Sequence, residues 1–508
     1  MTTSERKPGP TRRQLFSRAA AALGTGVAVQ AAGGIDQAAA APKANLPWGH
    51  AVGDPRGSDI AITTGRGGEA RFGLMFKKLP AFAPPDKLLT DLAARMEDPR
   101  VPGTDPSEGD VFDNQQVPAG FTFLGQFIDH DMTRDTTPLT DQQADPKGLT
   151  NFDTPLFDLG SVYGKGPTAD PALYESDGKR LRLVRNALGV VDLPRDANDN
   201  AFIGDPRNDE NHIIAQLQIA FIRLHNTLIA EGNSFANAKR LTQWRFQWII
   251  VNDYLPHIVG PKLVGQLLQP ANNRLSYVGK LYKPKNPNRP MMPLEYAVAA
   301  FRFGHSMIRP EYEMHDGSTV KIFGTDGEDL RGSCKLRPDV QADWNYFFEI
   351  PGMEPPDDRN MSRLMDTRLA LPLFHLPTTV VPDDTGPGAL PRIESLGARN
   401  LLRGKRLGMP SGQDVAAAMG FKPLTNAALG LTEPGWGGKA PLWYYVLKEA
   451  ELQYGGAHLG DVGGHIVAET ILGILSADKS SYLNANPTWR PGAGSWRMGN
   501  LLQKAGAI

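Results

Sequence analysis

IIAQLQIAFIRLHNTLIAE, which occupies residues 213–231, carries the clearest secondary-structure signal in the chain. Its apolar residues recur at steps of three and four, as on one buried face of a helix: Ile214, Leu217, Phe221, Leu224 and Leu228. Gly232 follows in the position of a C-cap. The segment therefore predicts a core helix that ends near Glu231.

The same spacing elsewhere predicts a mainly α fold. One helix is predicted over residues 239–255, ending at Pro256, and another from Pro293, a favoured first-turn residue, to Pro310. Two more are predicted over residues 440–453 and 464–475. Alternating strand patterns are few, and residues 318–323 are the best of them. We predict a single large α-helical domain with long loops and very little β structure.

Composition and charge exclude several classes of protein. The chain has 508 residues, 54 Lys and Arg against 55 Asp and Glu, and a net charge of -1, so it lacks the basic excess of a nucleic-acid binder. Cys334 is the single cysteine, which excludes an intramolecular disulfide and a cysteine-based zinc or iron–sulfur site. No run reaches the length of a membrane span.

The N-terminal segment is typical of an export signal. The sequence TRRQLF follows a basic start and precedes a short, weakly apolar run, and AAAAP at residues 38–42 offers a small-residue cleavage site. We predict a twin-arginine signal peptide over residues 1–41, an N-terminal extension over 42–71 and the main domain over 72–508. The twin-arginine pathway exports folded proteins, many of which take up a cofactor before export. We therefore expect an extracytoplasmic or secreted protein with a cofactor.

The segment GQFIDHDMT, at residues 125–133, is the first candidate for chemistry. It places Asp129, His130 and Asp131 in a row after an apolar helical run, where polar groups are costly to bury without partners. Gln126 and His130 are four residues apart and share one helix face. This pattern favours a functional histidine over an ordinary core histidine.

Two further motifs carry charge beside apolar helices. In DPRNDEN, at residues 205–211, Arg207 and Glu210 share a face if the segment is helical, although such clusters are by themselves typical of a solvated helix start. In FRFGHSMIRP, at residues 301–310, His305 lies in an apolar helix one turn after Arg302. Helical histidines of this kind are common haem ligands and still more common core residues. A buried Arg302 needs an anion.

Together these motifs resemble the animal-type haem peroxidase family, also called the peroxidase–cyclooxygenase superfamily, and especially its bacterial secreted members. The resemblance covers the chain from about Phe72 to the C-terminus, with the motifs in family order. It implies an enzyme with haem b that reduces hydrogen peroxide and oxidises a small donor such as a halide, thiocyanate or a phenol.

The resemblance also implies roles for individual residues. His130 is the distal acid–base, Gln126 lies near the bound peroxide or halide, and Arg207 stabilises charge on the departing hydroxide. His305 is the proximal iron ligand. Asn400, in the segment SLGARNLLRGKRLGMP, accepts the N–H of that ligand's ring.

Two carboxylates and one arginine are expected at the haem edge by the same resemblance. Asp129 and Glu210 match residues that form ester links to haem, so at least one ester is expected. Arg302 would pair with a haem propionate. Asn211 stands where one branch has a methionine, so no sulfonium link is expected.

A Ca²⁺ site is implied by the segment TPLFDLGSVYG at residues 154–164, which resembles the calcium loop of the family. Alternating oxygen donors of this kind suit a hard cation. Gly160 stands where the family usually has its last ligand, a serine, and Ser161 follows. The expected ligands are Asp131, Thr154, the Leu156 carbonyl, Asp158 and Ser161.

Two other classes of function compete with a peroxidase. A fatty-acid dioxygenase would share the fold and the haem, but that branch needs a tyrosine one turn before the proximal histidine, where this chain has Arg302. A non-catalytic haem-fold binding protein would lose distal residues, whereas His130 and Arg207 are both present. The reducing substrate and the oligomeric state stay open.

Overall fold

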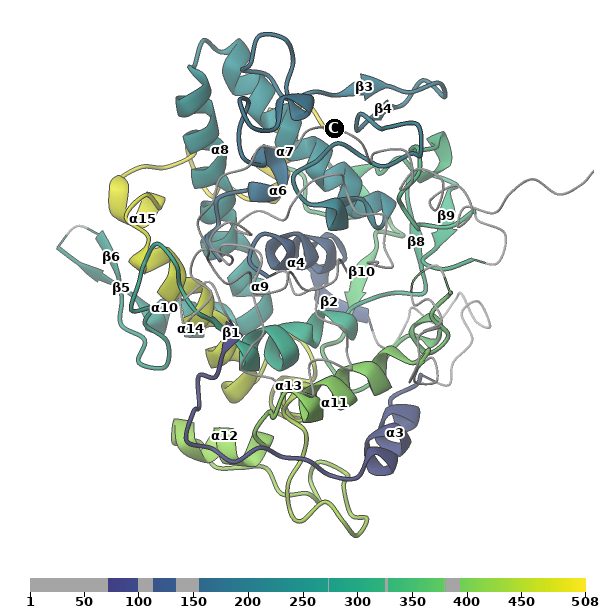
Figure 1. The fold of residues 1–508 in the computed structure, drawn as a ribbon, viewed down its shortest axis with the longest axis vertical. Helices are drawn as coiled ribbons and strands as arrows, with labels where there is room; N and C mark the ends of the chain where they lie inside the picture. The colour runs from purple at the N-terminus through teal and green to yellow at the C-terminus, as the bar shows by residue number, and fades with distance from the viewer. Residues whose placement is uncertain are drawn as a thin grey trace, which may run out of the picture. The chain divides into compact units, whose positions relative to one another are not determined.

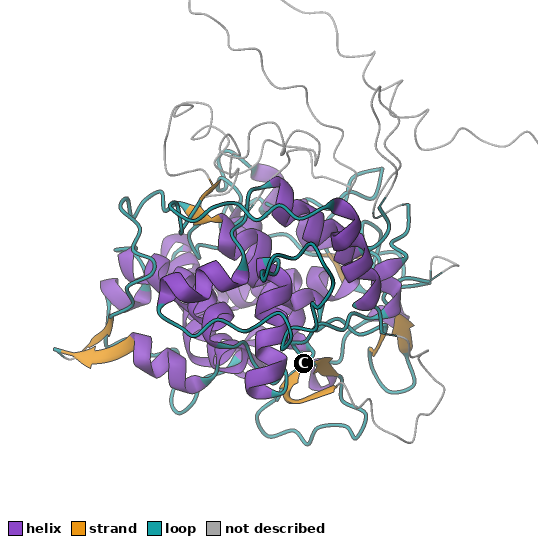
Figure 2. Ribbon diagram, turned by 90° about the horizontal axis from the view of Figure 1, so that it is seen from below, coloured by secondary structure: helices purple, strands orange, loops and turns teal. Residues whose placement is uncertain are grey.

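The computed structural model describes residues 72–98, 113–133, 155–272, 274–324, 328–378, 380 and 393–508. The signal peptide predicted over residues 1–41 and the extension over 42–71 lie outside these residues. The described residues belong to one compact unit and are mostly helical, which confirms the mainly α prediction. Figure 2 shows helices through the interior, with strands and loops mostly around them.

The β structure consists of five two-stranded sheets within the described residues. One pairs β1 and β7 in parallel, and the others are antiparallel. The predicted strand over residues 318–323 is present as the shorter β9. The strands are β1 (Phe72–Gly73), β2 (Asp113–Pro118), β3 (Val184–Arg185), β4 (Val191–Asp192), β5 (Leu268–Ala271), β6 (Arg274–Tyr277), β7 (Met292–Pro293), β8 (Glu311–Glu313), β9 (Thr319–Lys321) and β10 (Met361–Arg363).

Helix α4 (Gly120–His130) lies at the centre of the helices (Figure 1) and packs on α7 (His212–Ala230), the helix predicted from residues 213–231. Phe127 of α4 stacks on Phe221 of α7, with ring centroids 4.9 Å apart. A side chain at Gly125 would come within 2.5 Å of the Tyr254 hydroxyl, so only glycine allows this close approach. The packing places the last turn of α4 in the core.

The helix predicted over residues 239–255 does not end at Pro256. Helix α8 (Phe235–Ile249) continues into a π-helical turn, η3 (Ile250–Tyr254), and then into α9 (Leu255–Val259). Pro256 falls in the first turn of α9, where its missing N–H and fixed φ are tolerated. The wider π turn before it lets the chain continue in the same direction.

The single helix predicted over residues 293–310 is also wrong in detail. The chain forms β7, then a π turn, η4 (Glu295–Ala299), and then a 3-10 helix, η5 (Ala300–His305). Ala299 breaks the helix, with φ -124° and ψ -76°. The buried Glu295 carboxylate accepts the N–H groups of Met75 and Phe76, which holds η4 against the start of the domain. In the 3-10 geometry, Arg302 and His305 lie one above the other on one face.

The remaining helices surround this centre. The helices predicted at 440–453 and 464–475 are confirmed as α13 (Leu442–Tyr454) and α14 (Asp461–Ala477). The others are α3 (Asp86–Arg95), α6 (Gly160–Tyr163), α10 (Pro261–Leu267), α11 (Leu396–Arg406), α12 (Gly412–Met419), α15 (Tyr482–Ala485), α16 (Met498–Ala505) and the 3-10 turns η1 (Pro171–Leu173), η2 (Pro206–Asp209), η6 (Pro338–Val340), η7 (Trp344–Tyr346) and η8 (Leu371–Phe374).

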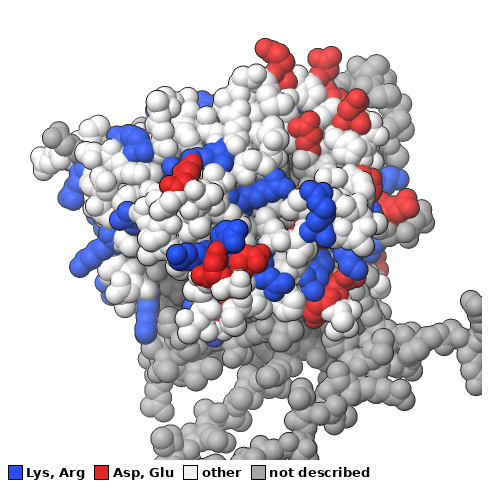
Figure 3. Space-filling view, turned by 90° about the horizontal axis from the view of Figure 1, so that it is seen from above, with Lys and Arg blue, Asp and Glu red and all other residues white. Residues whose placement is uncertain are grey.

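The burial of the apolar helix α7 and the distribution of surface charge bear on whether the protein binds a membrane or a charged partner. Of the helices that the structure describes, α7 alone has the length and hydropathy to cross a membrane, and 67% of that window is buried inside the protein. On the face shown in Figure 3, Lys and Arg side chains lie among Asp and Glu side chains, in keeping with the near-zero net charge.

Candidate active site

The end of α4 and the segment before α7 bring the predicted distal residues together. His130 is buried, and its Nε2 lies 3.6 Å from Glu210 Oε1. The Gln126 amide donates to the same Glu210 oxygen and accepts a 3.1 Å hydrogen bond from Asn211 Nδ2. Gln126 and His130 of α4 therefore form one polar cluster with Glu210, which is 84 positions from Gln126 in the sequence.

Arg207 is held against this cluster by a carboxylate that the sequence analysis missed. Asp205 caps η2 and accepts from the Arg207 backbone N–H, and Arg207 Nη2 lies 2.7 Å from Asp205 Oδ2. The same Nη2 donates to the His130 carbonyl at 2.9 Å. An aspartate two residues before an arginine at a helix start is a recognisable capping signal, and it could have identified Asp205.

The ring of His130 has a second partner that was also missed. Nδ1 lies 2.8 Å from Asn208 Oδ1, and Asn208 Nδ2 donates to Gln218 Oε1 at 2.9 Å. Gln218 Nε2 donates to the Ser161 carbonyl at 2.9 Å. The available signal was Gln218 itself, a polar residue that is buried within an apolar helix.

Burial raises the pKa of both carboxyl groups at this site. Burial raises the pKa of Asp129, while the charges of Arg207 and Arg302 act to lower it. Burial raises the pKa of Glu210 to about 7, and the charge of Arg207 again opposes the shift. Near neutral pH, Glu210 therefore exchanges readily between acid and carboxylate.

The predicted proximal residues, His305, Arg302 and Asn400, come together where η5 meets α11. Asn400, on α11, lies 2.7 Å from His305, measured from amide Nδ2 to ring Nδ1. Arg302 Nη1 donates to Asn400 Oδ1 at 3.1 Å, and Arg302 Nε donates to the Ala297 carbonyl. Burial and the charge of Arg302 lower the pKa of His305 to about 3, so its ring is neutral over the physiological range.

The distal and proximal groups face one region. Helix α4 contacts η5 directly, and the charge of Arg302 on η5 reaches the Asp129 carboxylate on α4. Two histidines, two arginines and two carboxylates therefore converge from α4, η2 and η5. Such a buried concentration of charge is typical of a functional site.

The predicted calcium loop lies against Asp131, and Thr154 falls outside the described residues. The two Asp131 carboxylate oxygens accept the backbone N–H groups of Leu159 and Gly160, at 2.9 Å and 2.7 Å. The Leu156 carbonyl accepts from the N–H of Asp158 at 2.9 Å. The Ser161 hydroxyl is buried and has no hydrogen-bond partner within the part of the chain that the structure describes.

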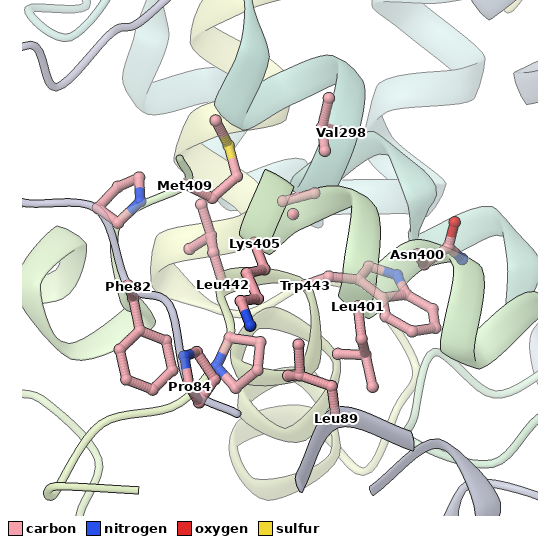
Figure 4. A pocket seen from close by; sticks show the side chains of 14 residues that line it. Phe82, Pro84, Leu89, Val298, Asn400, Leu401, Lys405, Met409, Leu442 and Trp443 are labelled. Atoms are coloured by element: carbon pink, nitrogen blue, oxygen red, sulfur yellow. The ribbon is translucent and has the colours of Figure 1, made fainter. Parts of the chain in front are cut away.

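A separate cavity lies behind the proximal side (Figure 4). It encloses roughly 340 Å³, part of it open to solvent, and Asn400 forms part of its wall. Most of the lining is apolar, with Leu401, Leu442 and Trp443 among it, and the Lys405 side chain reaches across it. The cavity contains none of the distal residues, so it is distinct from the cluster around His130.

Comparison with known proteins gives sequence relatives and structural neighbours. The chain is 27% identical over 203 residues to a "Peroxidase-like protein" of Margaritifera margaritifera, covering 36% of this chain and 24% of that protein. It is 26% identical over 196 residues to "Thyroid peroxidase" of Mus musculus, covering 33% of this chain and 20% of that protein. The chain thus matches about a quarter or less of the length of these relatives.

The structural neighbours share the fold at low sequence identity. "Peroxidase A from Dictyostelium discoideum" aligns with a TM-score of 0.55 and 16% identity over 86% of this chain and 92% of that chain. A fatty acid alpha-dioxygenase of Arabidopsis thaliana aligns with a TM-score of 0.55 and 14% identity over 84% of this chain and 74% of that one. Residues 129–428, more than half of the chain, match the family described as "Animal haem peroxidase". The chain therefore belongs to the animal haem peroxidase family.

Proposed function

We propose that the protein is a haem-dependent peroxidase that reduces hydrogen peroxide and oxidises a small donor. The observation that carries the proposal is the distal cluster. The Nε2 of a buried His130 faces Glu210, to which Gln126 also donates, and the Arg207 side chain is bonded to the His130 carbonyl. This set combines a proton acceptor with a fixed positive charge, as peroxide cleavage requires.

The donor set fits the haem that the family implies. His305 is a neutral imidazole, as an iron ligand needs, and the Asn400 amide lies beside its Nδ1. Arg302 offers a guanidinium to a propionate, and Asp129 and Glu210 are partly buried carboxyl groups suited to the haem rim. We infer that His305 holds the iron and that at least one of the two carboxyl groups forms an ester with the haem.

The chain's own residues would then move one proton and hold one charge. Bound haem supplies the iron at which the O–O bond of peroxide is broken. His130 Nε2 takes the proton from the inner peroxide oxygen and returns it to the outer one, so that water can leave. The Arg207 guanidinium, fixed by Asp205, stabilises the negative charge that develops on the departing oxygen.

A fatty-acid dioxygenase is the alternative within the same fold, because one structural neighbour has that activity and an equal TM-score. One turn before His305 the chain has Arg302, which is bonded to Asn400 and to the Ala297 carbonyl. A guanidinium in that position cannot act as the radical tyrosine. The arrangement supports the peroxidase proposal over the dioxygenase.

The test of the proposed function is stopped-flow mixing of the haem-loaded chain with hydrogen peroxide. His130→Ala should slow the first peroxide step by ~10²–10⁴-fold while haem stays bound. A donor panel of bromide, iodide, thiocyanate and a phenol then identifies the substrate, with a long-chain fatty acid and oxygen as the dioxygenase arm. An unchanged rate in His130→Ala refutes the distal assignment.

We also propose that Ca²⁺ binds between Asp131 and the loop at residues 154–161. The unpartnered, buried Ser161 hydroxyl supports a ligand there, and each Asp131 oxygen that accepts an N–H keeps further acceptor capacity. Elemental analysis after dialysis against a chelator tests this. Asp131→Asn should lose the metal, whereas Asp177→Asn, which removes a similar but exposed carboxylate, should keep it.

For localisation we propose export by the twin-arginine pathway. The support is the sequence pattern of residues 1–41 alone. Fusing this segment to a folded reporter protein tests it. Arg12→Lys combined with Arg13→Lys should block export, and equal export of both fusions refutes the proposal.

A further inference from the structure

Two buried amide side chains connect the ring of His130 to the main chain of another helix. Asn208 Oδ1 lies 2.8 Å from His130 Nδ1, and Asn208 in turn donates to Gln218 at 2.9 Å. Gln218 donates to the Ser161 carbonyl at 2.9 Å. Asn208 and Gln218 are 0% exposed. Burying two amides is costly unless their donors and acceptors are hydrogen-bonded, so the pair must be fixed by the bonds that they make.

The direction of this hydrogen-bond chain is fixed at its far end. The Ser161 carbonyl can only accept, so Gln218 must turn its NH₂ group toward it and its oxygen toward Asn208. Asn208 must then present its NH₂ group to Gln218 and its oxygen to His130. An oxygen facing the ring requires an N–H at Nδ1. In the neutral ring this leaves Nε2 as the unprotonated nitrogen.

The Ser161 end of the chain is itself held in place. The same carbonyl accepts a second hydrogen bond, from the Gly204 N–H at 2.8 Å. The two N–H groups before it, at Leu159 and Gly160, are bonded to Asp131. The acceptor that sets the direction is therefore part of a fixed turn.

We propose that Asn208 and Gln218 are positioning residues, which hold His130 in the tautomer that has its proton on Nδ1 and its lone pair on Nε2. The proposal rests on the proposed function, because only the Nε2 lone pair faces the groups of the distal cluster, with Glu210 Oε1 at 3.6 Å. The opposite tautomer would turn a ring lone pair toward the Asn208 oxygen. In a buried site that repulsion is not screened by water.

Three variants and one control separate positioning from ordinary packing. Asn208→Leu keeps the approximate volume and removes the acceptor. Gln218→Met keeps the length and frees the Asn208 amide to rotate. The double variant combines the two. Gln216→Leu is the matched control, since Gln216 lies on the same helix and its amide bonds only main-chain groups, those of His212, Val340 and Ala342.

The first readout is the rate of the first peroxide step in the haem-loaded chain. Asn208→Leu should slow it by about 10–100-fold, as removal of the partner that orients a functional histidine generally does. Gln218→Met should slow it less. Because Gln218 acts only through Asn208, the double variant should be no slower than Asn208→Leu alone. Gln216→Leu should keep the parent rate.

The second readout is the tautomer itself. In ¹⁵N-histidine-labelled full-length protein with ferrous haem and carbon monoxide, two-bond ¹H–¹⁵N correlations report which ring nitrogen carries the proton. The signal of His130 is assigned by its loss in His130→Gln. The parent should show Nδ1–H, and Asn208→Leu should shift the population toward Nε2–H, which a purely structural role for Asn208 would not do.

The outcomes are distinguishable. An Nε2–H ring in the parent overturns the proposal even if Asn208→Leu fails to fold. Where the variants fold, additive rate losses in the double variant overturn it as well. If the parent has the Nδ1–H ring and does not react with peroxide, the proposed function fails and the positioning role stands. A reactive parent whose rate is unchanged by Asn208→Leu refutes the positioning role alone.

Discussion

His305 and Asn400 are 95 positions apart in the sequence, yet the ring Nδ1 and the amide Nδ2 lie 2.7 Å apart. The Asn400 oxygen faces Arg302, so its nitrogen side faces the ring. The family resemblance implies an acceptor here, whereas the structure turns the amide nitrogen to the ring. If His305 binds iron through Nε2, its Nδ1 carries the proton and needs an acceptor. The Asn400 amide would then turn its oxygen toward the ring, and Arg302 would pair with a propionate in place of that oxygen.

The Asn400 amide should therefore tune the bound iron. We expect Asn400→Asp to lower the midpoint potential of the haem, because a carboxylate draws the ring proton and makes His305 a stronger donor. Asn400→Leu should raise the potential and weaken haem binding. Spectroelectrochemical titration measures both. Equal potentials in the parent and the two variants would contradict a direct contact between Asn400 and the iron ligand.

His305 should be required for haem binding. His305→Ala removes the neutral imidazole that the structure places beside Asn400, so we expect loss of a stoichiometric Soret band after reconstitution. His315→Ala removes a partly exposed ring that bonds the neighbouring Asp316 carbonyl; this variant is the control and should bind haem normally. Normal haem content in His305→Ala would refute the proximal assignment.

Arg207 should act through a fixed charge, because Asp205 holds its guanidinium. Arg207→Ala should slow the first peroxide step by about 10²–10³-fold, the range for loss of one positioned donor. Asp205→Asn keeps the arginine but weakens its anchor, so we expect a smaller loss. Stopped-flow kinetics gives both rates. A greater loss in Asp205→Asn than in Arg207→Ala would contradict this order of roles.

Glu210 should make stability depend on pH. Its pKa is about 7 in the folded chain, against 4.5 for an ordinary glutamate. Between these values the folded chain keeps a proton that the unfolded chain releases, so the free energy of unfolding falls as pH rises through this window. Below it both states are protonated, and above it both are ionised.

Glu210→Gln removes this titration. Urea unfolding of the haem-free parent and variant, measured at several pH values, should therefore show that the parent loses stability relative to the variant as pH rises from about 4.5 toward 7. Glu231→Gln, at an exposed glutamate that pairs with Lys504, is the control and should follow the parent. A constant difference between parent and Glu210→Gln would contradict the raised pKa.

Covalent haem attachment should depend on Asp129 or Glu210. After treatment with peroxide, acidified organic solvent should leave part of the haem on the protein, and mass spectrometry should find it on the peptide holding one of these residues. Asp129→Asn or Glu210→Gln should release the fraction held by that position. Complete extraction from the parent, with no added mass on either peptide, refutes the ester.

The local sequence was sufficient to predict the helices whose apolar residues are regularly spaced. The pattern at residues 213–231 predicts α7 because side chains three and four residues apart must share one face whatever surrounds them. The segment around His130 also favoured a functional histidine, whereas the roles of Arg207 and His305 came from the resemblance to the family and not from spacing. The 3-10 and π turns before His305 could not be predicted, because they depend on Glu295 bonding to Met75 and Phe76, far away in the sequence.

Tertiary structure alone decided which polar groups meet. Asp205 anchoring Arg207, and the hydrogen-bond path from His130 through Asn208 and Gln218 to the Ser161 carbonyl, join four separate segments of the chain. Spacing within a segment fixes which side chains share a face, but not which buried donor finds which acceptor. That choice is made by packing, because an unpaired buried polar group is costly and the helices bring only certain partners within reach.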